Sequence, residues 1–254
     1  MSNDAIATMG RLHIQGERRS TMADRRSLRL SATLLFGGVL LSLLAGYFHP
    51  GREPANNHQA TFAEYAASAP WIAVHLGQFA GMVVLIAGLL VLFVALNVDS
   101  GMPGWVARFG AISAGVALAL YGVLQAVDGV ALKHAVDAWV RAPAAEKAAR
   151  FASAEVIRWL EWGVRSYHSL MLGLALVLFG TVIVMTARTP RPVGYLMGLS
   201  GLAYLAQGWV IGAEGFSNTN TVPTLLGILS VLAWSIWLLV SAWRMQEPVE
   251  ASTT

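Results

Sequence analysis

The most regular feature of the sequence is a series of long apolar runs separated by shorter polar connections. Each run holds about 20 mainly apolar residues, the length that an α-helix needs to cross a bilayer. None of the runs alternates apolar and polar residues, as the strands of a membrane β-barrel do. Six segments fit this description, at residues 29–48, 72–97, 105–130, 166–187, 192–212 and 222–243. The pattern predicts an all-α, polytopic membrane bundle with six transmembrane helices.

The regions around these runs define the domain organisation. We predict one transmembrane domain over residues 25–245, with a disordered cytoplasmic segment at residues 1–24 and another at residues 246–254. In the longer connection at residues 49–71, Thr61 and Glu64 have the spacing of a capping box, which predicts a short helix that ends before Pro70. Residues 133–157 are rich in alanine, and we predict that they lie along the membrane interface before the fourth span begins.

Polar side chains recur at helical spacing near one end of several spans. Arg158, Glu161, Arg165 and His168 fall on one face of a helix, and Glu161 stands before Arg165 in the favourable order for an ion pair. A polar side chain that faces lipid near the hydrocarbon boundary costs of the order of 1–3 kcal/mol. We therefore predict that these stripes face one another around a polar cavity in the outer half of the bundle. The predicted ligand-binding residues are His75, Gln78, Gln125, Asp128, Glu161, Arg165, His168, Gln207 and Glu214.

Two segments of the sequence also resemble each other. "SAGVALALYGVLQAVDG" and "SGLAYLAQGWVIGAEG" match loosely with one gap, which predicts a parallel repeat of two hairpins, spans two and three and spans four and five. If the hairpins are equivalent, His75 corresponds to His168 and Asp128 to Glu214. The repeat would then bring two histidines and two acids to one depth.

Composition and charge support the membrane assignment. The chain is 56% hydrophobic and only 12% charged, whereas a soluble domain needs far more polar surface. The net charge of +3 arises from basic residues beside the apolar runs, so it does not indicate a nucleic-acid partner. By the positive-inside rule, their distribution predicts a bacterial cytoplasmic (inner) membrane protein with both termini in the cytoplasm. The absence of cysteine excludes disulfides and thiolate chemistry.

The histidines raise the question of a cofactor. His75 and His168 are candidates for the two axial ligands of haem b, although the sequence has no second pair of histidines near the cytoplasmic face. His75, His168, Asp128 and His134 are candidates for a hydrolytic metal site, but no HxxxH or HExxH motif occurs, so we predict no metal ligands. We expect His49 and His58 to be solvated in a loop.

These observations favour a membrane protein whose outer-leaflet cavity binds a small or lipid-like ligand, in a sensing, accessory or binding role. Two alternatives stay open, a b-type haem electron carrier that uses His75 and His168, and a membrane enzyme that acts on lipid-like substrates. A structural role beside a partner membrane subunit is a further alternative. The sequence identifies no catalytic residues.

Overall fold

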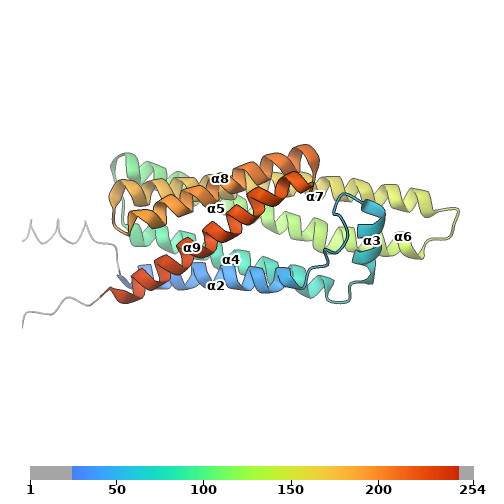
Figure 1. Ribbon diagram of the computed structural model, residues 1–254, viewed down its shortest axis with the longest axis horizontal. Helices are drawn as coiled ribbons and strands as arrows, with labels where there is room; N and C mark the ends of the chain where they lie inside the picture. Colours follow the sequence, from blue (N-terminus) through green and yellow to red (C-terminus); the bar gives the residue numbers. More distant parts are fainter. Residues whose placement is uncertain (1–24, 246–254) are drawn as a thin grey trace, which may run out of the picture.

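The computed structural model describes residues 25–245, and within them the chain forms helices and no strands. Six helices are long and apolar enough to cross a membrane (Figure 1), which confirms the predicted all-α fold class. The predictions for residues 1–24 and 246–254 lie outside the described residues. The six helices are α2 (Arg25–Tyr47), α4 (Trp71–Leu96), α5 (Gly101–Gln125), α7 (Lys147–Thr186), α8 (Arg191–Glu214) and α9 (Thr221–Arg244).

Two of these helices extend well beyond the others at one end of the bundle (Figure 1). Helix α5 continues through a π-helical segment, η1 (Ala126–Leu132), into α6 (Lys133–Arg141), and α7 is 40 residues long. The short helix α3 (His58–Ala67) packs against these extensions. We call residues 48–70 and 133–157 the head.

The head has a small hydrophobic core of its own. Its buried apolar side chains come from α3, α6 and α7 and from the adjoining ends of η1 and α4, namely Phe62, Tyr65, Trp71, Leu132, Val136, Trp139 and Ala154. Residues 133–157 were predicted to lie along the membrane interface, but their helices instead continue α5 and α7 beyond the end of the bundle (Figure 1). Burial of the core side chains against one another stabilises these two projecting helices.

Helix α3 confirms the predicted short helix, but its predicted start is wrong. The helix begins at His58, with the side chain of Asn57 as the N-cap that accepts from the backbone N–H of Ala60. The Thr61 hydroxyl instead donates to the carbonyl of Pro54 at 3.1 Å.

Close packing of small residues joins the spans in pairs. A Cβ atom added to Gly38 of α2 would lie 2.4 Å from the backbone nitrogen of Leu85 in α4. One added to Gly173 of α7 would lie 2.7 Å from the carbonyl oxygen of Gly201 in α8. Small residues let membrane helices approach this closely. The predicted repeat would require α4 to pair with α5 as α7 pairs with α8, and the structure does not confirm it.

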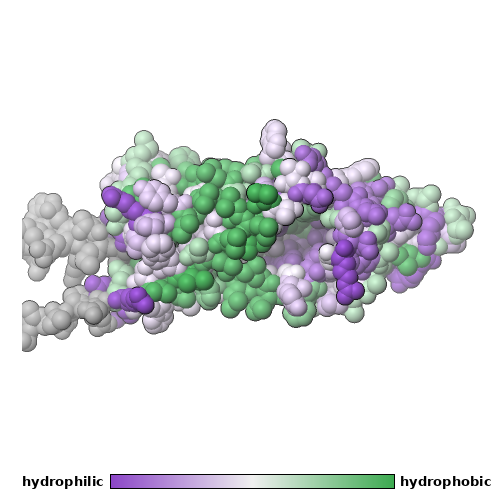
Figure 2. All heavy atoms as spheres, viewed as in Figure 1, coloured by the Kyte–Doolittle hydropathy of each residue, from purple (hydrophilic) through white to green (hydrophobic). Residues whose placement is uncertain are grey.

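The surface has an apolar belt between two more hydrophilic ends (Figure 2). Its exposed side chains come from the six long helices and include Leu40, Leu90, Phe109, Ile112, Leu174, Leu202, Leu229 and Ile236. Both ends of the described chain lie at the end opposite the head (Figure 1), where Arg29 donates to the carbonyls of Ala242 and Met245. The belt has the composition that lipid contact requires.

Candidate functional site

A polar cavity of about 500 Å³ lies between the bundle and the head. Its wall is formed by the head-side ends of α2, α4, α5, α7 and α9, by η1 and α3, and by the loop at residues 48–57. Figure 2 shows the hollow where the apolar belt meets the hydrophilic head. The lining side chains include His49, Glu53, Glu64, Tyr65, Gln78, Tyr121, Gln125, Asp128, Arg158, Glu161, Arg165, Phe216 and Thr224.

Five of the nine predicted ligand-binding residues line this cavity. They are Gln78, Gln125, Asp128, Glu161 and Arg165, which come from α4, α5, η1 and α7. The polar stripes on these helices therefore face one another, as expected from the cost of exposing such side chains to lipid.

The other four predicted residues have different positions. His75 lies behind the wall, where Nε2 is 3.1 Å from Oδ2 of Asp128. Gln207 reaches the wall indirectly, because its amide donates to the hydroxyl of Thr224.

His168 and Glu214 lie away from the cavity. The ring of His168 is buried, donates from Nδ1 to the carbonyl of Ala117 at 2.9 Å and packs on Tyr121. Glu214 is exposed and accepts from the hydroxyl of Ser217. Of the four side chains that the repeat would bring together, only His75 and Asp128 are in contact, and His75 and His168 have separate partners.

The closest ion pair in the wall joins Arg158 and Glu161. Their side chains are 2% and 4% exposed, and Nη1 lies 2.6 Å from Oε2. Arg158 also donates to the carbonyl of Ala55 and faces the rings of Tyr65 and Phe216. The sequence analysis expected Glu161 to pair with Arg165 and left Arg158 out of the predicted site. The spacing of three residues between Arg158 and Glu161 on one helix face could have predicted their ion pair.

Several buried polar atoms in the wall have no hydrogen-bond partner among residues 25–245. These atoms are Oε1 of Gln125, Oδ1 of Asp128, Nε of Arg158 and Nε of Arg165. A buried polar atom without a partner costs about 1–3 kcal/mol. Water or a bound ligand in the cavity would satisfy these atoms.

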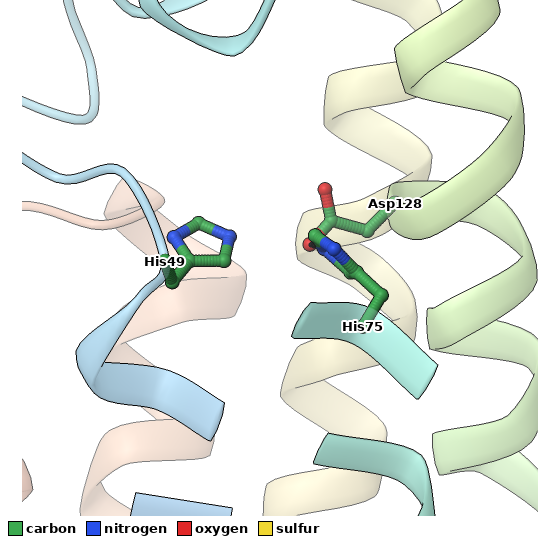
Figure 3. A group of neighbouring side chains, drawn as sticks. All are labelled: His49, His75 and Asp128. Carbon is green, nitrogen blue, oxygen red and sulfur yellow. Dashed lines mark hydrogen bonds and ion pairs between the residues drawn. The ribbon is translucent and has the colours of Figure 1, made fainter. Parts of the chain in front are cut away.

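His49 and Asp128 of the cavity wall form a group with His75, which lies behind it. One ligand atom from each of His49, His75 and Asp128 lies within 4.8 Å of the other two (Figure 3). Burial lowers the pKa of His49 below its usual value, although the nearby Asp128 opposes the shift. Sequence reasoning expected His49 to be solvated, but the loop turns back after α2, with His49 N–H donating to Gly46 O at 3.0 Å.

The π-helical segment η1 positions Asp128 in this group. The indole of Trp71 donates to the carbonyl of Gly129 at 3.0 Å and so joins the start of α4 to η1. A Cβ atom at Gly129 would lie 2.8 Å from Cβ of His75, so only glycine allows this approach without a shift. Single π-helical turns are frequent at functional sites.

No protein family model, curated protein or solved structure matches the chain. The fold and the cavity define the class, a multi-pass membrane protein with a polar cavity between its apolar bundle and its head.

Proposed function

We propose that this membrane protein binds the anionic group of a lipid-like ligand in the head-side cavity, with the apolar part of the ligand against the belt. The observation that carries the proposal is Arg165, a guanidinium in the cavity wall whose buried Nε has no partner among the described residues. The binding would serve a sensing, accessory or binding role in the membrane.

Four carboxylates also line the cavity, those of Glu53, Glu64, Asp128 and Glu161, and all but that of Glu53 contact a partner other than Arg165. Arg158 is neutralised by Glu161, and the carboxylate of Glu64 accepts from the backbone N–H groups of Arg52 and Glu53. Arg165 has no carboxylate partner in the described part of the chain. A guanidinium binds carboxylate and phosphate through two parallel hydrogen bonds, so a ligand with either group would satisfy it.

The position of the cavity supports a lipid-like ligand. Gly46 at the end of α2 and Thr224 at the start of α9 both line it, so the cavity reaches the surface between the ends of these helices. Leu44, Val222 and Leu225 on the same helix ends are exposed apolar side chains. A volume of about 500 Å³ accommodates a headgroup but not two acyl chains, so the chains would stay against the belt.

Lipid binding by the purified protein tests the proposal. Native mass spectrometry of detergent-solubilised protein should show a complex with a short-chain phosphatidic acid and little complex with phosphatidylcholine of the same chain length. Arg165→Gln should weaken the complex roughly 10–100-fold, because a hydrogen bond to a charged group contributes about 1.5–3 kcal/mol.

The matched control is Arg150→Gln, the same substitution on the same helix at a side chain that is 54% exposed. This variant should bind as the wild type does. A separate titration with inorganic phosphate distinguishes a lipid headgroup from a soluble anion. If the natural ligand is a soluble anion, inorganic phosphate should bind as tightly as the phosphatidic acid does. Equal binding of both lipids, or no effect of Arg165→Gln, would overturn the proposal.

A further inference from the structure

The two histidines beside the cavity have a defined protonation pattern. Nδ1 of His75 lies 2.8 Å from the carbonyl of Trp71, and Nδ1 of His49 lies 2.7 Å from the carbonyl of Pro50. A carbonyl only accepts, so in both rings Nδ1 carries the proton and donates it. In a neutral imidazole, Nε2 then carries a free lone pair.

Asp128 faces this lone pair instead of a donor. Oδ2 of Asp128 is 3.1 Å from Nε2 of His75, and Oδ1 is buried with no partner among the described residues. Two acceptors at this distance repel each other unless a cation lies beside them or the ring takes a second proton. Figure 3 shows the ring of His49 on the other side of the group, with one ring nitrogen turned toward Asp128 and His75.

We propose that His49, His75 and Asp128 bind one divalent transition-metal ion in the cavity wall, through Nε2 of each histidine and the carboxylate of Asp128. Two imidazoles and one carboxylate form a ligand set of catalytic zinc and of non-haem iron sites. Metal-binding histidines commonly donate their other ring N–H to a backbone carbonyl, and both histidines here do so. The carboxylate of Asp128, whose buried Oδ1 has no partner among the described residues, completes the set.

The spacing suits an ion of this class. Four-coordinate zinc holds its nitrogen and oxygen ligands about 2.0–2.2 Å from the metal, which places them about 3.4 Å from one another. Nε2 of His75 and Oδ2 of Asp128 are already 3.1 Å apart. The third ligand, His49, lies in the loop at residues 48–57. Its ring nitrogen is within 4.8 Å of the other two ligand atoms, so it would have to move by no more than about 1.5 Å to reach the ion.

Three protein ligands leave a coordination position for water or for a ligand atom. This position faces the cavity, because His49 and Asp128 both line it. The ion would add a positive charge to that of Arg165 in the wall, and both charges would attract the same anionic ligand. The metal site nevertheless rests on its own contacts, so it does not depend on the proposed lipid binding.

Cobalt binding tests the site directly. Protein purified in detergent and treated with a chelator should take up one Co²⁺ per chain, with visible absorption bands of a low-coordinate nitrogen and oxygen site, and Zn²⁺ should displace the Co²⁺. His49→Gln and Asp128→Asn should each weaken binding by more than the roughly 10–100-fold that changes outside the ligand set cost. His49→Gln lies on a loop, so it carries the test even if Asp128→Asn fails to fold.

The matched controls are His134→Gln, an exposed histidine of the head, and Asp137→Asn, which pairs with Lys133. Both should bind Co²⁺ as the wild type does. A wild type that binds no Co²⁺, or ligand variants that bind it unchanged, would overturn the metal site and leave a histidine–aspartate ion pair in its place. Arg165→Gln should retain Co²⁺ binding, so failure of the metal site and failure of lipid binding give different results.

Discussion

The two halves of the bundle use the same helices but are held together differently. The terminal half comprises residues 25–42, 81–117, 169–205 and 227–245, and the cavity half comprises residues 43–80, 118–168 and 206–226. In the terminal half, Leu89, Leu92 and Phe179 are fully buried in one apolar core, and the helices touch at glycines. In the cavity half, buried ion pairs and an aromatic cluster take that role.

The halves also differ in how well their polar atoms are satisfied. In the terminal half, the hydroxyl of Ser31 donates to Gly88 O and the indole of Trp234 donates to Ser200. Seven of the nine buried side-chain atoms without a partner among residues 25–245 lie in the cavity half. Buried polar atoms without partners are expected at functional or strained sites, so this difference supports the proposal that the cavity half contains the functional site.

The largest expected effect is the loss of one partner of the buried ion pair in the cavity half. Glu161→Leu should destabilise the protein by about 3–5 kcal/mol, because Arg158 then becomes a buried charge without compensation. Unfolding by sodium dodecyl sulfate, followed by circular dichroism in mixed micelles, measures the change. The double variant Arg158→Met, Glu161→Leu should recover most of the stability, since replacing both charges with apolar side chains is often neutral. A double variant as unstable as Glu161→Leu would contradict this account.

A smaller loss of stability is expected when a side chain is added at a close helix contact in the terminal half. Gly38→Ala should cost about 1–3 kcal/mol, because its Cβ would lie 2.4 Å from a backbone nitrogen of α4 and the helices must separate. Gly37→Ala on the same helix is the matched control, with nothing within 4 Å of the added atom. Thermal unfolding in detergent should show a lower midpoint for Gly38→Ala alone. Equal midpoints for the two variants would show that close packing does not hold α2 on α4.

The hydrophobic pattern predicted the terminal half well and the head poorly. Bilayer thickness fixes the length of a span, so α8 and α9 begin and end within a few residues of the predicted segments. Helix α7 begins at Lys147, far before the predicted start at residue 166. The intervening residues are amphipathic, and periodicity alone does not distinguish a helix on the membrane surface from one that packs in a head.

Part of the candidate site could also be predicted from the sequence. Gln78, Gln125 and Arg165 were predicted because a polar side chain on a membrane span faces the interior of the bundle or a water-filled cavity and not the lipid. His49 was missed because it lies in a loop, where no period constrains the path of the backbone. The contact between Asp128 and His75 depends on a π-helical turn, and a helical pattern read at 3.6 residues per turn does not place it.

Removal of the hydrogen bond that joins α4 to η1 should lower the stability of the protein by a modest amount. Trp71→Phe keeps the aromatic packing of the head but removes the donor to Gly129 O, which should cost roughly 1 kcal/mol. Amide hydrogen exchange in residues 126–132 should accelerate as this segment loses its anchor. Trp209→Phe is the control, because that tryptophan is 76% exposed and its replacement should leave exchange unchanged. Unchanged exchange in Trp71→Phe would show that η1 is held by its own backbone.

The smallest expected effect comes from the ion pair between Arg150 and Glu146, which lies at the start of α7 and, unlike the pair of Arg158 and Glu161, is exposed. Both side chains are more than half exposed, and their closest atoms are 3.1 Å apart. Solvent screens such a pair, so Glu146→Gln should change the free energy of unfolding by less than about 0.5 kcal/mol. The small difference should shrink further in high salt, whereas the effect of Glu161→Leu should persist. If Glu146→Gln lowered the free energy of unfolding as much as Glu161→Leu does, burial would not explain the different contributions of the two ion pairs. The contrast between the buried pair of the cavity half and a surface pair would then be wrong.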